Sequence, residues 1–145
     1  MNVARGIVTA AMLTGLAVGA AGAASAAPTM SGHYIMTATS ESGLTTNTGD
    51  WYFTSCGDGC ASVASTPGGQ AFGQARLRDG KWTLVWHSDA ICLGGSSVPG
   101  ALSSYDTWDA NTLAGTDESG PTSTAVCGYG ARPRVTLNMQ LTPAG

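Results

Sequence analysis

The chain has 145 residues, only 10% of them are charged, and its formal net charge is −3 at neutral pH. Charged residues make up roughly a quarter of a typical globular domain, so this chain is unusually poor in them. The sequence holds no basic cluster that would neutralise phosphates, which excludes nucleic acid as an expected partner.

The N-terminus shows the features of a cleavable signal peptide in their usual order. Arg5 is followed by an uncharged apolar run over residues 6–21, and small residues at Ala24–Ala26 match an A-x-A cleavage site. The run is shorter than the roughly 20 residues of a membrane-spanning helix, so an uncleaved anchor is the less favoured alternative. We therefore expect a signal peptide over residues 1–26 and one secreted domain over residues 27–145.

Beyond the signal peptide, apolar and polar residues alternate repeatedly, as they do in β-strands that bury one face. The first expected strands cover residues 32–40, 50–55 and 60–65. No stretch shows the apolar spacing of a helix. No second long apolar run is present either, so we expect no membrane span once the signal peptide is removed.

A hairpin is expected over residues 72–88. Asp79-Gly80 lies between its two halves, and this dipeptide is a strong signal for a tight turn between antiparallel strands. In the second half Trp82, Leu84 and Trp86 share one face, which predicts that these three side chains point inward.

The remaining strands are expected at residues 102–108, 112–117 and 134–142, with a turn at Asp109–Asn111. The connecting stretches are rich in Gly, Ser, Thr and Pro and lie at residues 41–49, 66–70, 94–100 and 118–125. About eight short strands in sequential hairpins predict an all-β fold with an antiparallel meander. A closed barrel is preferred, because closure removes exposed edge strands, and a two-sheet sandwich is the alternative.

Four cysteines lie in the expected domain, and an even number in an exported chain of this size indicates two disulfides. Of the three pairings, Cys56–Cys60 and Cys92–Cys127 are favoured, because Gly57-Asp58-Gly59 can turn tightly between the first two cysteines. A redox or zinc site is less favoured, since the spacing is not Cys-x-x-Cys and His33 and His87 are not spaced as ligands.

Four segments resemble a group of small exported proteins from mycobacteria and related actinobacteria. The segments are Gly32–Tyr34, Trp51–Cys60, Lys81–Leu84 and Asp109–Thr116. The turn bracketed by cysteines after an aromatic strand is the most specific of them. The resemblance implies export and a β-fold, and it implies no enzymatic role.

The sequence carries no catalytic motif that we recognise. Residues 95–100 do not fit a Gly-x-Ser-x-Gly nucleophile turn, and His87 with Asp89 lacks an identified nucleophile. The oxygen-bearing side chains that a calcium site would use are more simply explained as turn formers. These are Asp106, Asp109, Asn111, Asp117 and Glu118. We therefore expect no enzyme, no metal site and no cofactor.

The aromatic residues have two interpretations. They fill the core of a small barrel, or some of them line a pocket for a small apolar ligand. In the second case Trp82, Trp86 and Met139 are the expected ligand-binding residues. The first function we expect is a non-enzymatic domain that acts through its surface, at the cell envelope or on a host partner. The alternatives are a carrier of a small apolar ligand in a barrel mouth and an enzyme of a type that the sequence does not reveal.

Overall fold

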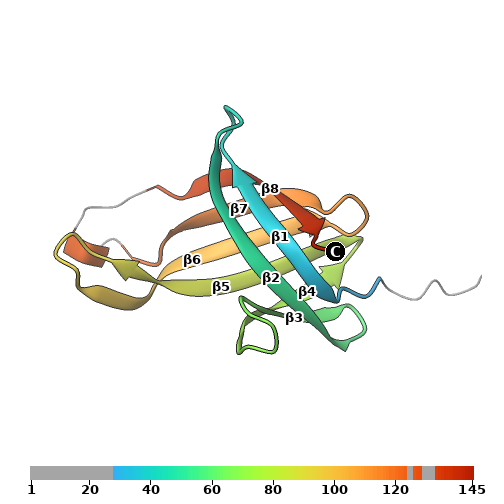
Figure 1. Cartoon of the computed structure of the whole chain (residues 1–145). Helices are drawn as coiled ribbons and strands as arrows, with labels where there is room; N and C mark the ends of the chain where they lie inside the picture. Colours follow the sequence, from blue (N-terminus) through green and yellow to red (C-terminus); the bar gives the residue numbers. More distant parts are fainter. Residues whose placement is uncertain (1–27, 124–125, 129–132) are drawn as a thin grey trace, which may run out of the picture.

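The computed structural model describes residues 28–123, 126–128 and 133–145. Eight antiparallel strands follow one another around a closed barrel in sequence order, and the last pairs with the first (Figure 1). The strands are β1 (Gly32–Thr39), β2 (Thr45–Gly57), β3 (Cys60–Ala64), β4 (Ala71–Arg78), β5 (Lys81–Ile91), β6 (Ser97–Asp109), β7 (Ala114–Pro121) and β8 (Val135–Pro143). The predicted all-β meander is confirmed, and the architecture is the barrel rather than the sandwich.

Several strands are longer than predicted, and β2, β6 and β7 gain the most residues. β2 begins at Thr45 rather than residue 50, β6 begins at Ser97 rather than residue 102, and β7 continues to Pro121. The added residues are rich in Ser, Thr, Gly and Pro, so no apolar alternation marks them. Pairing with the neighbouring strand forms these extensions, because Gly49 lies opposite Met36 and Ser97 lies opposite Ile91. The predicted connections at 41–49, 94–100 and 118–125 are therefore too long.

The two ends of the barrel differ. At the turn end, short connections join β2 to β3, β4 to β5 and β6 to β7. The other connections lie at the opposite end, which we call the loop end. There the β5–β6 hairpin projects beyond the barrel wall, beside the short turn Val126–Gly128 (Figure 1). Asp79 and Gly80 have φ angles of 50° and 75°, as a two-residue hairpin turn requires. The predicted hairpin is thus confirmed.

Inward side chains fill the barrel from the turn end to its middle. Trp82, Leu84 and Trp108 are almost completely buried, and the rings of Trp82 and Trp108 stack with centroids 6.4 Å apart. Met139 and Leu141 of β8 close the core from the other side. This part of the interior is packed, so any open space in the barrel lies towards the loop end.

Both predicted disulfides are present. Cys56–Cys60 brackets the β2–β3 turn. Cys92–Cys127 ties the β5–β6 connection to the segment between β7 and β8. Disulfides persist in oxidising compartments, so the two bonds are compatible with an extracellular protein.

The signal peptide expected over residues 1–26 lies outside the described residues. Within residues 28–123, 126–128 and 133–145, we find no helix with the length and apolar character needed to cross a membrane.

Candidate functional site

Two adjoining cavities open at the loop end of the barrel. The first, of about 370 Å³, lies where the short strand β3 ends and is walled by Trp51 and Phe72. The second, of about 340 Å³, lies over β6 and β7 and reaches Asp117. Trp86 and Asn47 line both cavities. The two cavities therefore adjoin each other at these two residues, and together we call them the mouth.

The position of Trp86 follows from the alternation of β5. Trp82 and Leu84 occupy the preceding inward positions and are buried in the core, whereas Trp86 is only partly buried. Its ring contacts that of Phe72, with centroids 5.2 Å apart, and Phe72 in turn contacts Trp51. Three aromatic side chains from three strands thus form one wall of the mouth.

A pair of carboxyl groups lies below the mouth, inside the barrel. Asp106 of β6 and Asp117 of β7 are cross-strand neighbours. They are 1% and 7% exposed, respectively. The indole Nε1 of Trp86 donates a hydrogen bond of 2.6 Å to Oδ2 of Asp106. The aromatic wall and the carboxyl pair are therefore connected directly.

Burial controls the ionisation of this pair. Loss of solvation, followed by repulsion from Asp117, raises the pKa of Asp106 to about 8, although the Trp86 hydrogen bond opposes the shift. Burial also raises the pKa of Asp117, while a hydrogen bond from Asp106 and the charge of Arg134 act in the opposite direction. Of the two carboxyl groups, Asp106 is therefore the one that keeps its proton at neutral pH.

The structure places the predicted ligand-binding residues in two different environments. Trp86 lines the mouth. Trp82 and Met139 are 2% exposed and lie in the core, and neither is among the residues that line the mouth. Both side chains face inward as the alternation predicted, but they lie too deep, since other core side chains cover them. The structure therefore gives Trp82 and Met139 a packing role.

Sequence analysis did not select Phe72 as a candidate site residue. It placed Asp106 and Asp117 in one group with Asp109, Asn111 and Glu118, whose side chains lie outside the mouth. Asp109 accepts hydrogen bonds from the backbone N–H of Asn111 and Thr112, which are the main reason why its pKa is lowered. Glu118 binds Arg134 on the outer face of β7. No group of three His, Cys, Asp or Glu side chains suited to a metal ion occurs in the described part of the chain. The inward position of Asp106 could have been predicted from the sequence, because Asp106 lies two residues before Trp108 in β6 and therefore on the same face of the strand.

Two other polar arrangements lie outside the mouth or at its rim. His33 and Asp50 form an exposed pair with 2.7 Å between Nε2 and Oδ1, and the His33 ring stacks on Tyr52. Asp89 accepts a hydrogen bond from the Gly100 N–H instead of meeting His87. Neither arrangement supplies a nucleophile held by a base.

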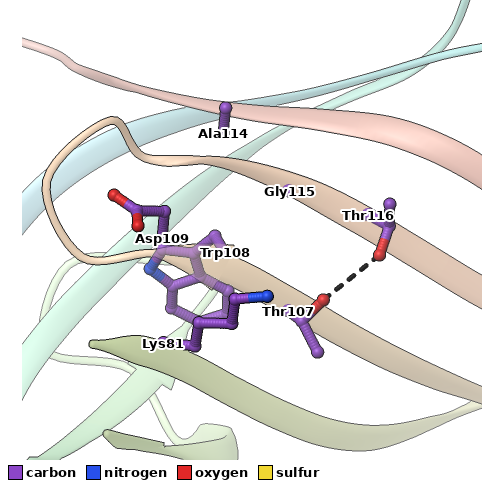
Figure 2. A pocket seen from close by; sticks show the side chains of 7 residues that line it. All are labelled: Lys81, Thr107, Trp108, Asp109, Ala114, Gly115 and Thr116. Atoms are coloured by element: carbon purple, nitrogen blue, oxygen red, sulfur yellow. Dashed lines mark hydrogen bonds between the residues drawn. The ribbon is translucent and has the colours of Figure 1, made fainter. Parts of the chain in front are cut away.

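A separate hollow of about 250 Å³ lies at the turn end, over β6 and β7 (Figure 2). The hydroxyl groups of Thr107 and Thr116 form a hydrogen bond there, with 3.1 Å between the two Oγ1 atoms. Lys81 and Asp109 lie opposite each other on neighbouring strands. Gly115 forms part of the floor. The hollow has no aromatic wall comparable with the mouth and is the weaker candidate for ligand binding.

The fold and the mouth define a small disulfide-linked barrel with a partly aromatic cavity above a buried carboxyl pair. Comparison with protein-family models, curated proteins and solved structures finds no match for this chain. Because one barrel fold serves many activities, function is inferred from the site alone.

Proposed function

We propose that this protein is an exported barrel that binds a small molecule in its mouth. The observation that carries the proposal is the pair of adjoining cavities that share Trp86 and Asn47. Cavities that bind small molecules usually have volumes of roughly 300–1,000 Å³, and each of the two lies at the lower end of that range.

The lining of the mouth supports an amphipathic ligand. Trp51, Phe72 and Trp86 present aromatic surface in the first cavity, where a flat apolar group gains most from burial. The second cavity adds the carboxyl group of Asp117 and the hydroxyl groups of Ser88, Ser104 and Ser119 to an otherwise largely apolar lining. A ligand with an apolar body and a polar end therefore matches the two halves.

Export is the second part of the proposal. It is supported by the signal-peptide pattern of residues 1–26 and by the two disulfides. Binding without chemical turnover is the third part. Among the described residues no hydroxyl group of Ser or Thr is hydrogen-bonded to His33 or His87, and such a contact is the mark of an activated nucleophile.

Titration with the neutral fluorescent probe N-phenylnaphthylamine tests this function. We expect saturable binding that Trp86→Ala weakens by at least about tenfold, since buried Trp side chains often dominate binding energy. Asn47→Trp should also weaken binding, because the exposed Asn47 lines both cavities and a larger side chain there fills them.

Val85→Ala is the matched control, because Val85 precedes Trp86 but lies exposed on the outer face of β5. It should bind the probe as the wild type does. Absence of saturable binding, or equal affinity in all four proteins, would overturn the proposed function.

A second candidate function is interaction through the tip of the β5–β6 hairpin. Ile91 and Leu93 are 72% and 86% exposed, and Val98 lies on the paired strand beside them. Exposed apolar side chains gathered at a projecting tip often mark a contact surface. Ile91→Ser with Leu93→Ser should then reduce retention on isolated cell-envelope material, whereas Val85→Ser should not; equal retention would exclude this role.

A further inference from the structure

We propose that the ligand of the mouth carries a protonated amine, which pairs with Asp117 while the apolar body lies against Trp86. This inference rests on the proposed function and specifies the chemical class of its ligand. Four observations support it: the position of Asp117, the incomplete hydrogen bonding of its side chain, the neighbouring hydroxyl groups and the aromatic wall.

Asp117 is buried and yet lines the second cavity. A charged carboxylate removed from water is stable only when a hydrogen-bond donor or a cation compensates it. Asp106 supplies one hydrogen bond in its protonated form. Oδ1 of Asp117 is buried and receives no hydrogen bond from an N–H or hydroxyl group of the described residues. The carboxyl group of Asp117, which lines the second cavity, is therefore only partly compensated by the protein.

The described cationic side chain that acts on Asp117, Arg134, is engaged elsewhere. Arg134 attracts Asp117 over a distance, but its guanidinium donates to Oε1 and the carbonyl of Glu118 and to Oγ of Ser103. Those contacts lie on the outer side of β6 and β7. Among the described residues, Asp117 is thus left without a direct ion pair.

The surroundings of Asp117 suit an ammonium group. An ammonium has three N–H donors and no acceptor, so it needs several oxygen atoms close together. Ser104 and Ser119 line the same cavity and are cross-strand neighbours in β6 and β7. Asp117 with these two hydroxyl groups provides one carboxyl and two hydroxyl acceptors. A bound ammonium group stabilises the ionised form of Asp117, whereas a neutral donor does so less and an anion disfavours it.

Trp86 favours the same ligand class. Its indole ring lines both cavities, and a cation over an indole face is attracted by the ring electrons. Its N–H is already donated to Asp106, so it offers the ligand only its π-face and edges. An aromatic or aliphatic amine with a short linker spans from this ring to Asp117.

Three probes with the same aromatic body and different charge test the inference: naphthylethylamine, naphthylethanol and naphthylacetate. In the wild-type protein the protonated amine should bind at least about tenfold more tightly than the alcohol, as a charge-assisted hydrogen bond implies, and the acetate most weakly. Asp117→Asn should abolish the preference for the amine while retaining affinity for the alcohol, which also shows that this variant is folded.

Glu118→Gln is the matched control, because it removes the same charge from the next residue, whose side chain lies on the outer face. It should keep the preference for the amine. Equal affinity for amine and alcohol in the wild type, or a preference that survives Asp117→Asn, would overturn the amine assignment and leave the proposed function standing. Failure of all three probes to bind would count against both.

Discussion

The indole Nε1 of Trp86 and Oδ2 of Asp106 lie 2.6 Å apart and join the aromatic wall of the mouth to the buried carboxyl pair. Trp86 and Asp106 come from adjacent strands, β5 and β6, and are separated by 20 residues in sequence. The indole N–H of Trp86 is thus a fixed hydrogen-bond donor to the carboxyl pair. Burial of Asp106, whose effect on the pKa this hydrogen bond opposes, makes the stability of the barrel depend on the protonation of Asp106.

The first prediction concerns pH and Asp106. Its pKa rises from 3.8 to about 8 in the folded protein, so the folded state binds more protons than the unfolded chain between these values. The free energy of unfolding should therefore fall as the pH rises through this window, by up to about 1.4 kcal/mol per unit. Asp106→Asn keeps the shape of the neutral carboxyl and removes the titration.

Urea unfolding at about pH 5 and about pH 7.5 measures this effect. Between these conditions the wild type should lose about 3 kcal/mol relative to Asp106→Asn, because the slope of about 1.4 kcal/mol per pH unit acts over most of this interval. Parallel pH profiles for the two proteins would show that the buried pair does not titrate as we describe.

The second prediction concerns the indole N–H of Trp86, which donates the hydrogen bond to Asp106. Trp86→Phe keeps an aromatic ring in the mouth but leaves Oδ2 of Asp106 without its hydrogen bond. A buried acceptor that loses its partner costs about 1–3 kcal/mol, and we expect a loss of that size in the free energy of unfolding. Denaturant unfolding is the measurement, with Val85→Ala on the outer face as the control. A Trp86→Phe protein as stable as the wild type would exclude a stabilising role for the contact.

The third prediction compares the two disulfides. Cys92–Cys127 spans 35 positions and Cys56–Cys60 spans 4. In the chain-entropy model, removal of the first bond costs about 4 kcal/mol and removal of the second about 2 kcal/mol. We expect the Cys92→Ala/Cys127→Ala protein to unfold at a lower urea concentration than Cys56→Ala/Cys60→Ala. The reverse order would mean that native-state contacts, rather than loop closure, determine the effect.

The fourth prediction concerns Gly115 at the turn end. A Cβ atom at this position would lie 1.7 Å from the carbonyl oxygen of Thr107 and 2.6 Å from Cα of Trp108. Backbone atoms cannot move aside as a flexible side chain can, so Gly115→Ala should destabilise the barrel by about 2 kcal/mol or more. Gly49→Ala is the control, because a Cβ there meets nothing within 4 Å. Similar melting temperatures for the two variants would contradict this steric argument.

Alternation predicted the fold because each buried strand repeats the same two-residue period. Trp82 and Leu84 in β5, and Met139 and Leu141 in β8, are buried at the positions that the period selects. The disulfides were also predictable, since a short cysteine loop with two glycines favours one pairing over the others. The strand ends at Thr45, Ser97 and Pro121 were not, because hydrogen bonds to neighbouring strands form them without an apolar pattern.

The site was predicted only in part. The alternation of apolar and polar residues predicted that Trp86 faces inward. Alternation does not predict how deep in the barrel a side chain lies, so Trp82 and Met139 were assigned to the mouth although they lie in the core. Asp106 and Asp117 were noticed only as oxygen ligands. Their pairing depends on the register of β6 against β7, which the sequence of neither strand reveals.

The sequence by itself determined that the chain forms short antiparallel strands held by two disulfides, because local alternation and cysteine spacing act over a few residues. Only the tertiary structure decided that the sheet closes and that Trp86 lies at the edge of the packed core. It also decided that two aspartates meet inside the barrel below the mouth. These features arise from the register between strands and from the depth of each residue in the barrel, and both depend on how all eight strands pair at once.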